Sequence, residues 1–131
     1  MIVFEYRADK FGQKRPLVDL HLKTRSGEWT TIHPFIDSGA DVSLIPLSIG
    51  HLVGLSSIGK KVRRIGGISG GIPVIYTTIW TKIGKTELQA EVAWAQIENV
   101  PTLLGRRDFF DKFHITFKQN EGKIIFSIAA N

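Results

Sequence analysis

The sequence predicts a mostly β protein that forms a single domain. Three observations support this prediction: several stretches alternate apolar and polar residues, turn-forming Gly, Asn and Ser residues separate them, and helical periodicity is scarce. The 131 residues, 43% of them hydrophobic, suffice for one compact domain with a modest core. We therefore expect residues 1–131 to form one domain.

The alternation typical of a half-buried strand is clearest where Val18, Leu20 and Leu22 are interleaved with polar residues. Near the C-terminus, Gln-Asn-Glu-Gly at residues 119–122 separates two β-rich stretches and predicts a hairpin. The other expected strands, together with the two arms of this hairpin, cover residues 29–36, 72–82, 87–95, 114–118 and 123–128.

Helical signals are confined to two short segments. Phe109, Phe110 and Phe113 have the spacing of one helical face, so residues 107–113 are expected to form a short C-terminal helix. A second short helix is expected to begin near Pro46, because the fixed φ of proline suits a first turn, and to end at Gly50 or Gly54.

Composition excludes several classes of protein. There is no cysteine, which excludes disulfide frameworks, thiolate metal sites and cysteine nucleophiles. No apolar run approaches the roughly 20 residues that span a bilayer, and residues 1–7 lack the apolar core of a signal peptide. We expect no membrane association and a cytoplasmic location. The net charge of +5 is spread over scattered basic pairs, which disfavours nucleic acid as a partner.

The first motif that points to chemistry is an acid at the end of an apolar strand. Asp37 follows Phe35-Ile36 and is itself followed by Ser38-Gly39-Ala40 and a second acid, Asp41. A carboxylate held by backbone N–H groups needs neighbours without bulky side chains, and these residues provide them. An ordinary turn has the same residue preferences, so this motif alone does not decide between the two interpretations.

The second motif is rich in glycine. Residues 65–72 read Ile-Gly-Gly-Ile-Ser-Gly-Gly-Ile between two β-like arms, which indicates the tip of a hairpin over residues 62–76. Four glycines allow positive φ without steric cost and permit backbone amides to approach a bound chain closely. A solvent-exposed turn is the alternative interpretation.

The third motif is a short apolar strand that ends in glycine. Pro101-Thr102-Leu103-Leu104 leads through Gly105 and Arg106 directly into the expected C-terminal helix. Taken in this order, the three motifs resemble those of the retropepsins, the single-domain aspartic peptidases, over residues 17–118. The resemblance implies a closed acid-protease barrel with one short C-terminal helix, assembled as a C2 homodimer, and it identifies the hairpin over residues 62–76 as the flap.

The resemblance also implies roles for individual residues. Asp37 is the expected catalytic residue, Ser38 the hydroxyl that braces the dimer, and the Asp41–Arg106 pair the bridge from the active loop to the C-terminal helix. Leu104 and Gly105 join Arg106 as structural support. The expected substrate-binding residues are Ser38, Gly39, Ala40, Asp41, Gly66, Gly67, Ile68, Ser69 and Gly70.

Two departures from the retroviral pattern concern the C-terminal part of the chain. The segment after Gly105 is about one residue longer than in the retroviral members, and the hairpin over residues 114–128 extends beyond their usual end. The second departure changes the expected dimer interface, because chain ends interleave in those members. Neither departure affects the acidic loop.

Aspartic peptidases use two carboxylates that share one proton around a water molecule. This chain offers one suitable loop, so a two-fold axis must supply the second Asp37. The expected function is therefore a homodimeric aspartic endopeptidase that acts on peptide substrates at acidic to near-neutral pH and requires no cofactor or metal. The four histidines are isolated, without metal-ligand spacing.

Two alternatives to the peptidase stay open. One is a catalytically inactive dimerisation or peptide-binding module with the same fold, because fold does not determine activity. The other, less favoured, is a small basic β-barrel that binds nucleic acid through aromatic residues such as Trp29, Trp80 and Trp94. We expect these tryptophans to lie in the core or in an interface.

Overall fold

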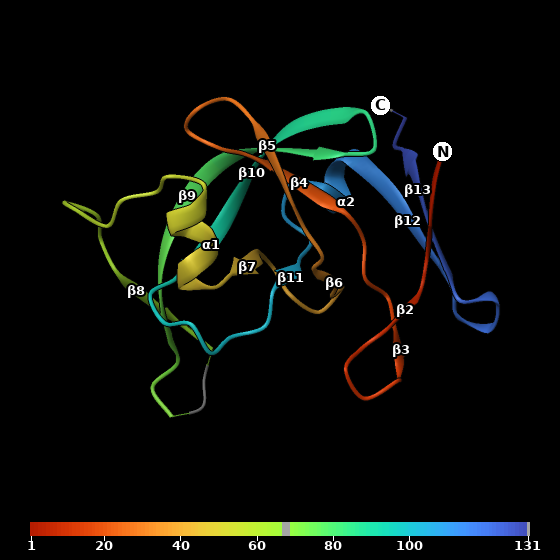
Figure 1. Ribbon diagram of the computed structural model, residues 1–131, viewed down its shortest axis with the longest axis horizontal. Helices are drawn as coiled ribbons and strands as arrows, with labels where there is room; N and C mark the ends of the chain where they lie inside the picture. Colours follow the sequence, from red (N-terminus) through yellow and green to blue (C-terminus); the bar gives the residue numbers. More distant parts are fainter. Residues whose placement is uncertain (67–68, 131) are drawn as a thin grey trace.

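The computed structural model describes residues 1–66 and 69–130, and it confirms the prediction of a mostly β fold (Figure 1). The helices are α1 (Leu47–Leu52), α2 (Phe109–Lys112) and the 3-10 turn η1 (Gln119–Glu121). The strands are β1 (Ile2–Glu5), β2 (Arg7–Ala8), β3 (Lys14–Arg15), β4 (Leu20–Lys23), β5 (Trp29–Ile32), β6 (Phe35–Ile36), β7 (Ser43–Ile45), β8 (Arg63–Ile65), β9 (Ile72–Ile83), β10 (Thr86–Ala95), β11 (Leu103–Leu104), β12 (Phe113–Lys118) and β13 (Lys123–Ile128).

The main sheet has the strand order β5-β4-β9-β10-β7-β11-β6, with β8 paired to β9. Its centre is the long antiparallel hairpin of β9 and β10, paired from Ile83 and Thr86 to Val74 and Ala95. Successive side chains of a strand point to opposite faces, so Ile79, Thr81 and Ile83 are buried while Trp80 faces solvent. This alternation is the signal that the sequence carried, and most of the expected strands are confirmed with shifts of one or two residues at their ends. The stretch expected over residues 29–36 is instead divided into β5 and β6, because the chain leaves the strand conformation at His33 and Pro34.

A second, smaller sheet has the order β1-β13-β12 and brings the two chain ends close together (Figure 1). The hairpin predicted over residues 114–128 is confirmed, with Gly122 in the left-handed region (φ 65°) at the end of η1. The ring of Phe126 meets Phe4 and Phe113 edge to face, at centroid distances of 5.5 and 5.3 Å. These contacts join the N-terminal strand, which the sequence did not predict, to the core.

Helix α1 lies against β10 through one close contact. The helix begins next to Pro46, as expected, but Pro46 is its extended N-cap rather than a residue of the first turn, and the helix ends at Leu52 rather than at Gly50 or Gly54. Gly50 packs against the indole of Trp94, which is only 1% exposed. The indole Nε1 donates a hydrogen bond to the Leu47 carbonyl at 3.1 Å. Trp94 is thus the core residue that the sequence indicated, with its one polar atom satisfied.

Two expectations need correction or restriction. Trp80 is 45% exposed, so it is not a core residue, because it lies on the outward face of β9; the other expected location, an interface, stays a prediction. The main sheet is a half-barrel whose strand order runs from β5 to β6 without returning, so closure into a barrel stays a prediction. No helix among the described residues has the length and apolar character needed to cross a membrane.

The contact between α1 and β10 gives a stability prediction. A Cβ atom on Gly50 would lie 1.9 Å from Nε1 of Trp94, so Gly50→Ala forces a buried indole to move. Overpacking costs about 1–3 kcal/mol, which outweighs the helix-propensity gain of about 1 kcal/mol. Urea unfolding should show a net loss of stability. Leu52→Ala, at an exposed position of the same helix, is the control; increased stability of Gly50→Ala would contradict the packing described here.

Candidate active site

Asp37 stands where strand β6 ends, and strand pairing fixes its position. Strand β6 runs parallel to β11, with Phe35 opposite Leu103 and Ile36 opposite Leu104. The ladder continues for one further bond, because the Asp37 N–H donates to the Leu104 carbonyl at 2.9 Å. The backbone of Asp37 therefore belongs to the sheet, while its half-buried side chain belongs to the following loop.

The loop after Asp37 binds the Asp37 carboxylate through a backbone N–H group. The Gly39 N–H donates to Oδ1 of Asp37 at 2.9 Å, and the Ala40 N–H donates to the Asp37 carbonyl at 3.2 Å. A Cβ atom on Gly39 would lie 3.3 Å from the same Oδ1, tighter than most contacts of that kind. The small residues thus allow the backbone to approach and orient the carboxylate, as the sequence motif predicted.

The segment from Leu104 to Arg107 crosses this loop and is bonded to it at successive positions. The Arg106 N–H donates to the Ala40 carbonyl and the Arg107 N–H to the Asp41 carbonyl, both at 2.9 Å. Gly105 lies so close to the loop that a Cβ atom there would be 2.6 Å from the backbone of Val42. Only glycine fits at this crossing without displacing the loop.

One residue of the site was missed by sequence reasoning. Ser43 begins β7, is 1% exposed, and accepts a hydrogen bond from the Gly105 N–H through Oγ at 2.9 Å. A buried N–H without a partner is costly, so this hydroxyl completes the crossing. The available signal was one small hydroxyl residue within the apolar run Val42-Ser43-Leu44-Ile45.

The predicted contact between Asp41 and Arg106 is present. The Arg106 guanidinium pairs with the Asp41 carboxylate and also lies 3.4 Å from the Ser38 carbonyl. Because the two side chains are 53% and 76% exposed, water screens the pair, which contributes less than about 1 kcal/mol. The pair holds the Asp41 carboxylate beside Arg106.

The neighbouring arginine is also paired. Arg107 binds Glu91 of β10 at 2.6 Å. The Glu91 N–H in turn donates to Asp108, whose φ of 70° is unusual for a residue with a side chain. Asp108 is the N-cap of α2, which explains why the helix begins at Phe109 rather than at residue 107.

The glycine-rich segment forms the predicted hairpin. Strand β8 pairs with β9 from Arg63 opposite Val74 to Ile65 opposite Ile72. Gly66, Gly70 and Gly71 have φ of 85°, 82° and 77°, and Ser69 has φ of 57°. Two expected substrate-binding residues, Gly67 and Ile68, lie outside the described residues. The hairpin is confirmed, whereas its function as a flap stays a prediction.

The structure therefore brings together two of the three sequence motifs. Loop 37–41 and segment 104–107 form one hydrogen-bonded unit around Asp37. Within the part of the chain that the structure describes, no three His, Asp or Glu side chains gather as metal ligands do.

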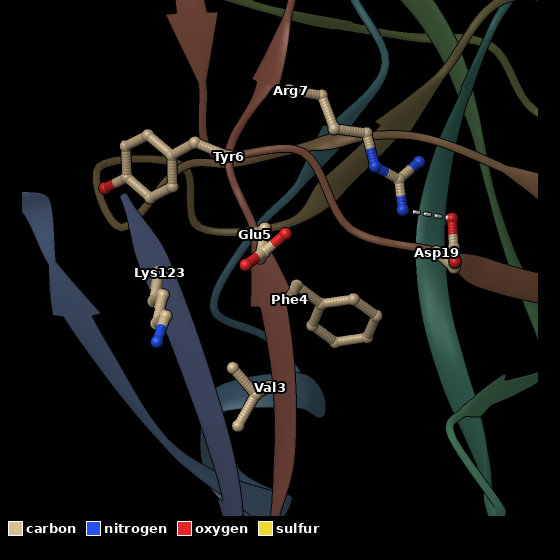
Figure 2. Close-up of a pocket in the computed structure, with 7 residues that line it drawn as sticks. All are labelled: Val3, Phe4, Glu5, Tyr6, Arg7, Asp19 and Lys123. Atoms are coloured by element: carbon tan, nitrogen blue, oxygen red, sulfur yellow. Dashed lines mark hydrogen bonds and ion pairs between the residues drawn. The ribbon is translucent and has the colours of Figure 1, made fainter. Parts of the chain in front are cut away.

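A cavity of about 680 Å³ lies elsewhere, beside β1 (Figure 2). Figure 2 shows Arg7 and Asp19 at one side of it, paired at 2.7 Å, and Glu5 and Lys123 at the other. Partial burial raises the pKa of Asp19, but the hydrogen bond and positive charge of Arg7 outweigh it and hold the pKa below its usual range. A satisfied, ionised aspartate of this kind is a structural group rather than a proton donor.

Comparisons with known proteins identify the fold. No protein-family model and no curated protein matches the sequence. A retropepsin-like aspartic protease from Rickettsia conorii is similar in structure, with a TM-score of 0.69, 13% identity, and coverage of 95% of this chain and 90% of that one. The EIAV protease in complex with the inhibitor HBY-793 is similar with a TM-score of 0.55, 22% identity, and coverage of 72% and 84%. The resemblance stated from the three motifs is thereby confirmed as a resemblance of fold.

The hydroxyl of Ser43 gives a prediction about the crossing. Ser43→Ala leaves the buried Gly105 N–H without a partner and should lower the free energy of unfolding by about 1–3 kcal/mol. Chemical denaturation measures this loss, and amide hydrogen exchange at Gly105 should accelerate relative to the unmodified protein. Ser57→Ala, at an exposed position, is the matched control. Equal stability and exchange in both variants would show that the hydrogen bond is unimportant.

Proposed function

Because this chain has the retropepsin-like fold, we propose that it is an aspartic endopeptidase whose active site is completed by a second copy of itself. The observation that carries the proposal is the placement of Asp37: it ends a strand that is pinned by Leu104, and the Gly39 N–H orients its carboxylate. A preorganised carboxylate at a strand end is the arrangement that acid–base catalysis needs.

The chemistry requires two such groups. One carboxylate takes a proton from water while the other, protonated, donates to the scissile carbonyl, so the pair shares a single proton between steps. Asp41 is not the second member, because it belongs to the same loop as Asp37 and its carboxylate is paired with Arg106. A two-fold axis beside Asp37 supplies the partner without any further residue type.

The rest of the predicted site follows from this axis. Ser38, next to the catalytic residue and exposed, is positioned to contact its counterpart across the interface. An extended peptide would then lie between the two Asp37 loops and the two glycine-rich hairpins, pairing its backbone with residues 38–41 and 66–70. Leu104, Gly105 and Arg106 support the loops from behind. A cytoplasmic location stays a prediction.

An inactive module with the same fold is the competing proposal. The hydrogen bond from the Gly39 N–H to the Asp37 carboxylate is compatible with both proposals, because an aspartate forms the same bond in an ordinary turn. The two proposals differ in whether the protein cleaves peptides, which the Asp37→Asn variant tests.

Asp37→Asn tests the catalytic role. The amide keeps the oxygen that accepts from Gly39 but cannot exchange the proton, so turnover of an unfolded protein substrate should fall by at least about 10²–10⁴-fold. A statine-type transition-state mimic should also inhibit the unmodified protein. Asp111→Asn, an exposed aspartate on α2, should retain activity. Full cleavage by pure Asp37→Asn protein would refute the proposed mechanism.

Mixed dimers test whether each site contains two copies of Asp37. When unmodified and Asp37→Asn chains are unfolded together in equal amounts and refolded, random pairing leaves about one quarter of the dimers with both carboxylates. Specific activity should therefore fall as the square of the unmodified fraction. A linear fall to about one half would mean that one chain suffices, and would contradict the shared site.

A further inference from the structure

The outward face of strands β5, β4, β9 and β10 carries an unexpected row of side chains. Trp29 on β5 is paired with Lys23 on β4, and Trp80 on β9 is paired with Gln89 on β10. Strand β4 lies between β5 and β9 and joins the two pairs. It pairs with β9 at His21–Lys82 and Leu22–Thr81, and the next position of this register sets Lys23 beside Trp80. The sequence-distant residues Trp29, Lys23, Trp80 and Gln89 thus form one line across the sheet.

The adjacent row is polar and can form hydrogen bonds. It consists of Thr31, His21, Lys82 and Glu87, in the same strand order. His21 and Thr31 are within 2.7 Å of each other through their side chains. The two rows therefore combine two indole rings with polar and charged side chains rather than with further apolar residues.

Positive charge gathers around the indoles. The ammonium of Lys82 lies 4.6 Å from the centroid of the Trp29 ring, and that of Lys23 lies 5.7 Å from it. Beside Trp80, a shallow cavity of about 270 Å³ is lined by Lys23 and by Arg25, whose guanidinium donates to the Gly54 carbonyl. Within the two rows, Lys23 and Lys82 outnumber the one acid, Glu87. The fold collects charges that are scattered along the sequence.

This face is separate from the candidate active site. In the strand order of the sheet, β5, β4, β9 and β10 precede β7 and β11, whereas Asp37 follows β6 at the opposite end. The proposed peptidase chemistry therefore gives no reason for Trp80 to be 45% exposed. A large aromatic side chain left in water next to cations is typical of a binding surface.

We propose that this face binds single-stranded nucleic acid. Strands β5 and β9 are separated by one strand, so Trp29 and Trp80 stand about 10 Å apart, twice the spacing of paired strands. Bases stack on such rings whatever their sequence, and sheet faces are platforms for this mode of binding. Lys23, Lys82 and Arg25 then lie beside the two rings, where the phosphates of the bound strand pass.

Two other anionic partners fit less well. An acidic peptide would be attracted by the lysines but has no planar groups to cover two indoles. An anionic membrane surface would favour apolar neighbours around the tryptophans, whereas Gln89, His21 and Thr31 occupy those positions. Polar groups beside aromatic rings suit base edges above a stacking surface.

Fluorescence anisotropy with labelled 12-nucleotide oligo-dT and oligo-rU, at a series of salt concentrations, tests the proposal. Trp80→Leu should weaken binding by about 5- to 100-fold, the range found for loss of one stacked base. Lys23→Gln should reduce the slope of log affinity against log salt by about 0.7, the value for one phosphate contact. Phe117→Leu and Lys60→Gln, exposed positions outside the two rows, are the matched controls and should change neither quantity.

Several outcomes would overturn the proposal. These are absence of binding to both oligonucleotides at low salt, equal affinity of Trp80→Leu and the unmodified protein, or a Trp80-dependent affinity for poly-glutamate or anionic vesicles that exceeds the affinity for oligonucleotides. Comparison of the DNA and RNA arms shows which sugar is preferred. The Asp37→Asn variant should bind the oligonucleotides as the unmodified protein does. Absence of oligonucleotide binding would therefore leave the proposed peptidase activity untouched, and absence of peptidase activity would leave the proposed nucleic-acid binding untouched.

Discussion

The backbone hydrogen bonds between loop 37–41 and segment 104–107 are the constraint on which the candidate site depends. Leu104, Arg106 and Arg107 are each bonded to this loop, and Ser43 satisfies the remaining N–H of Gly105. The two segments are more than sixty positions apart in the chain, so each bond also closes a long loop and fixes the order of β6, β11 and β7. The two segments can meet because Gly105 has no side chain.

This constraint explains which parts of the site the sequence predicted. Asp37 and Gly39 reflect local requirements, namely an acid at a strand end and a turn next to its carboxylate. Such requirements are visible in the identities of consecutive residues. The strands of the long hairpin were predictable for the same reason, because burial on one face imposes a period of two on β9 and β10. Gly105 was expected only from the resemblance to the retropepsins, because its contact with Val42 joins distant parts of the chain.

Features that depend on residues distant in sequence could not be predicted in this way. The role of Ser43 exists only because Gly105 is folded over it, and a single serine in an apolar run carries no such information. Strand β1 pairs with β13 at the other end of the chain. Trp80 was expected in the core or in an interface, and its position in the alternation of β9 excludes the core.

The domain carries two surfaces that differ in construction. The crossing around Asp37 has few exposed apolar groups and is built from backbone, whereas the face with Trp29 and Trp80 is built from side chains that project from paired strands. A chain with one oriented carboxylate per copy needs self-association for peptide hydrolysis. A flat aromatic and basic face needs none, so the two proposals make different demands on oligomeric state.

A crystal structure of the assembled protein with a peptide-like transition-state mimic would show whether two copies of Asp37 share one site. We expect a two-fold dimer in which carboxylate oxygens of the two Asp37 side chains lie about 3 Å apart and both contact the hydroxyl of the mimic. A monomer, or a dimer in which the two Asp37 side chains point away from each other, would contradict it.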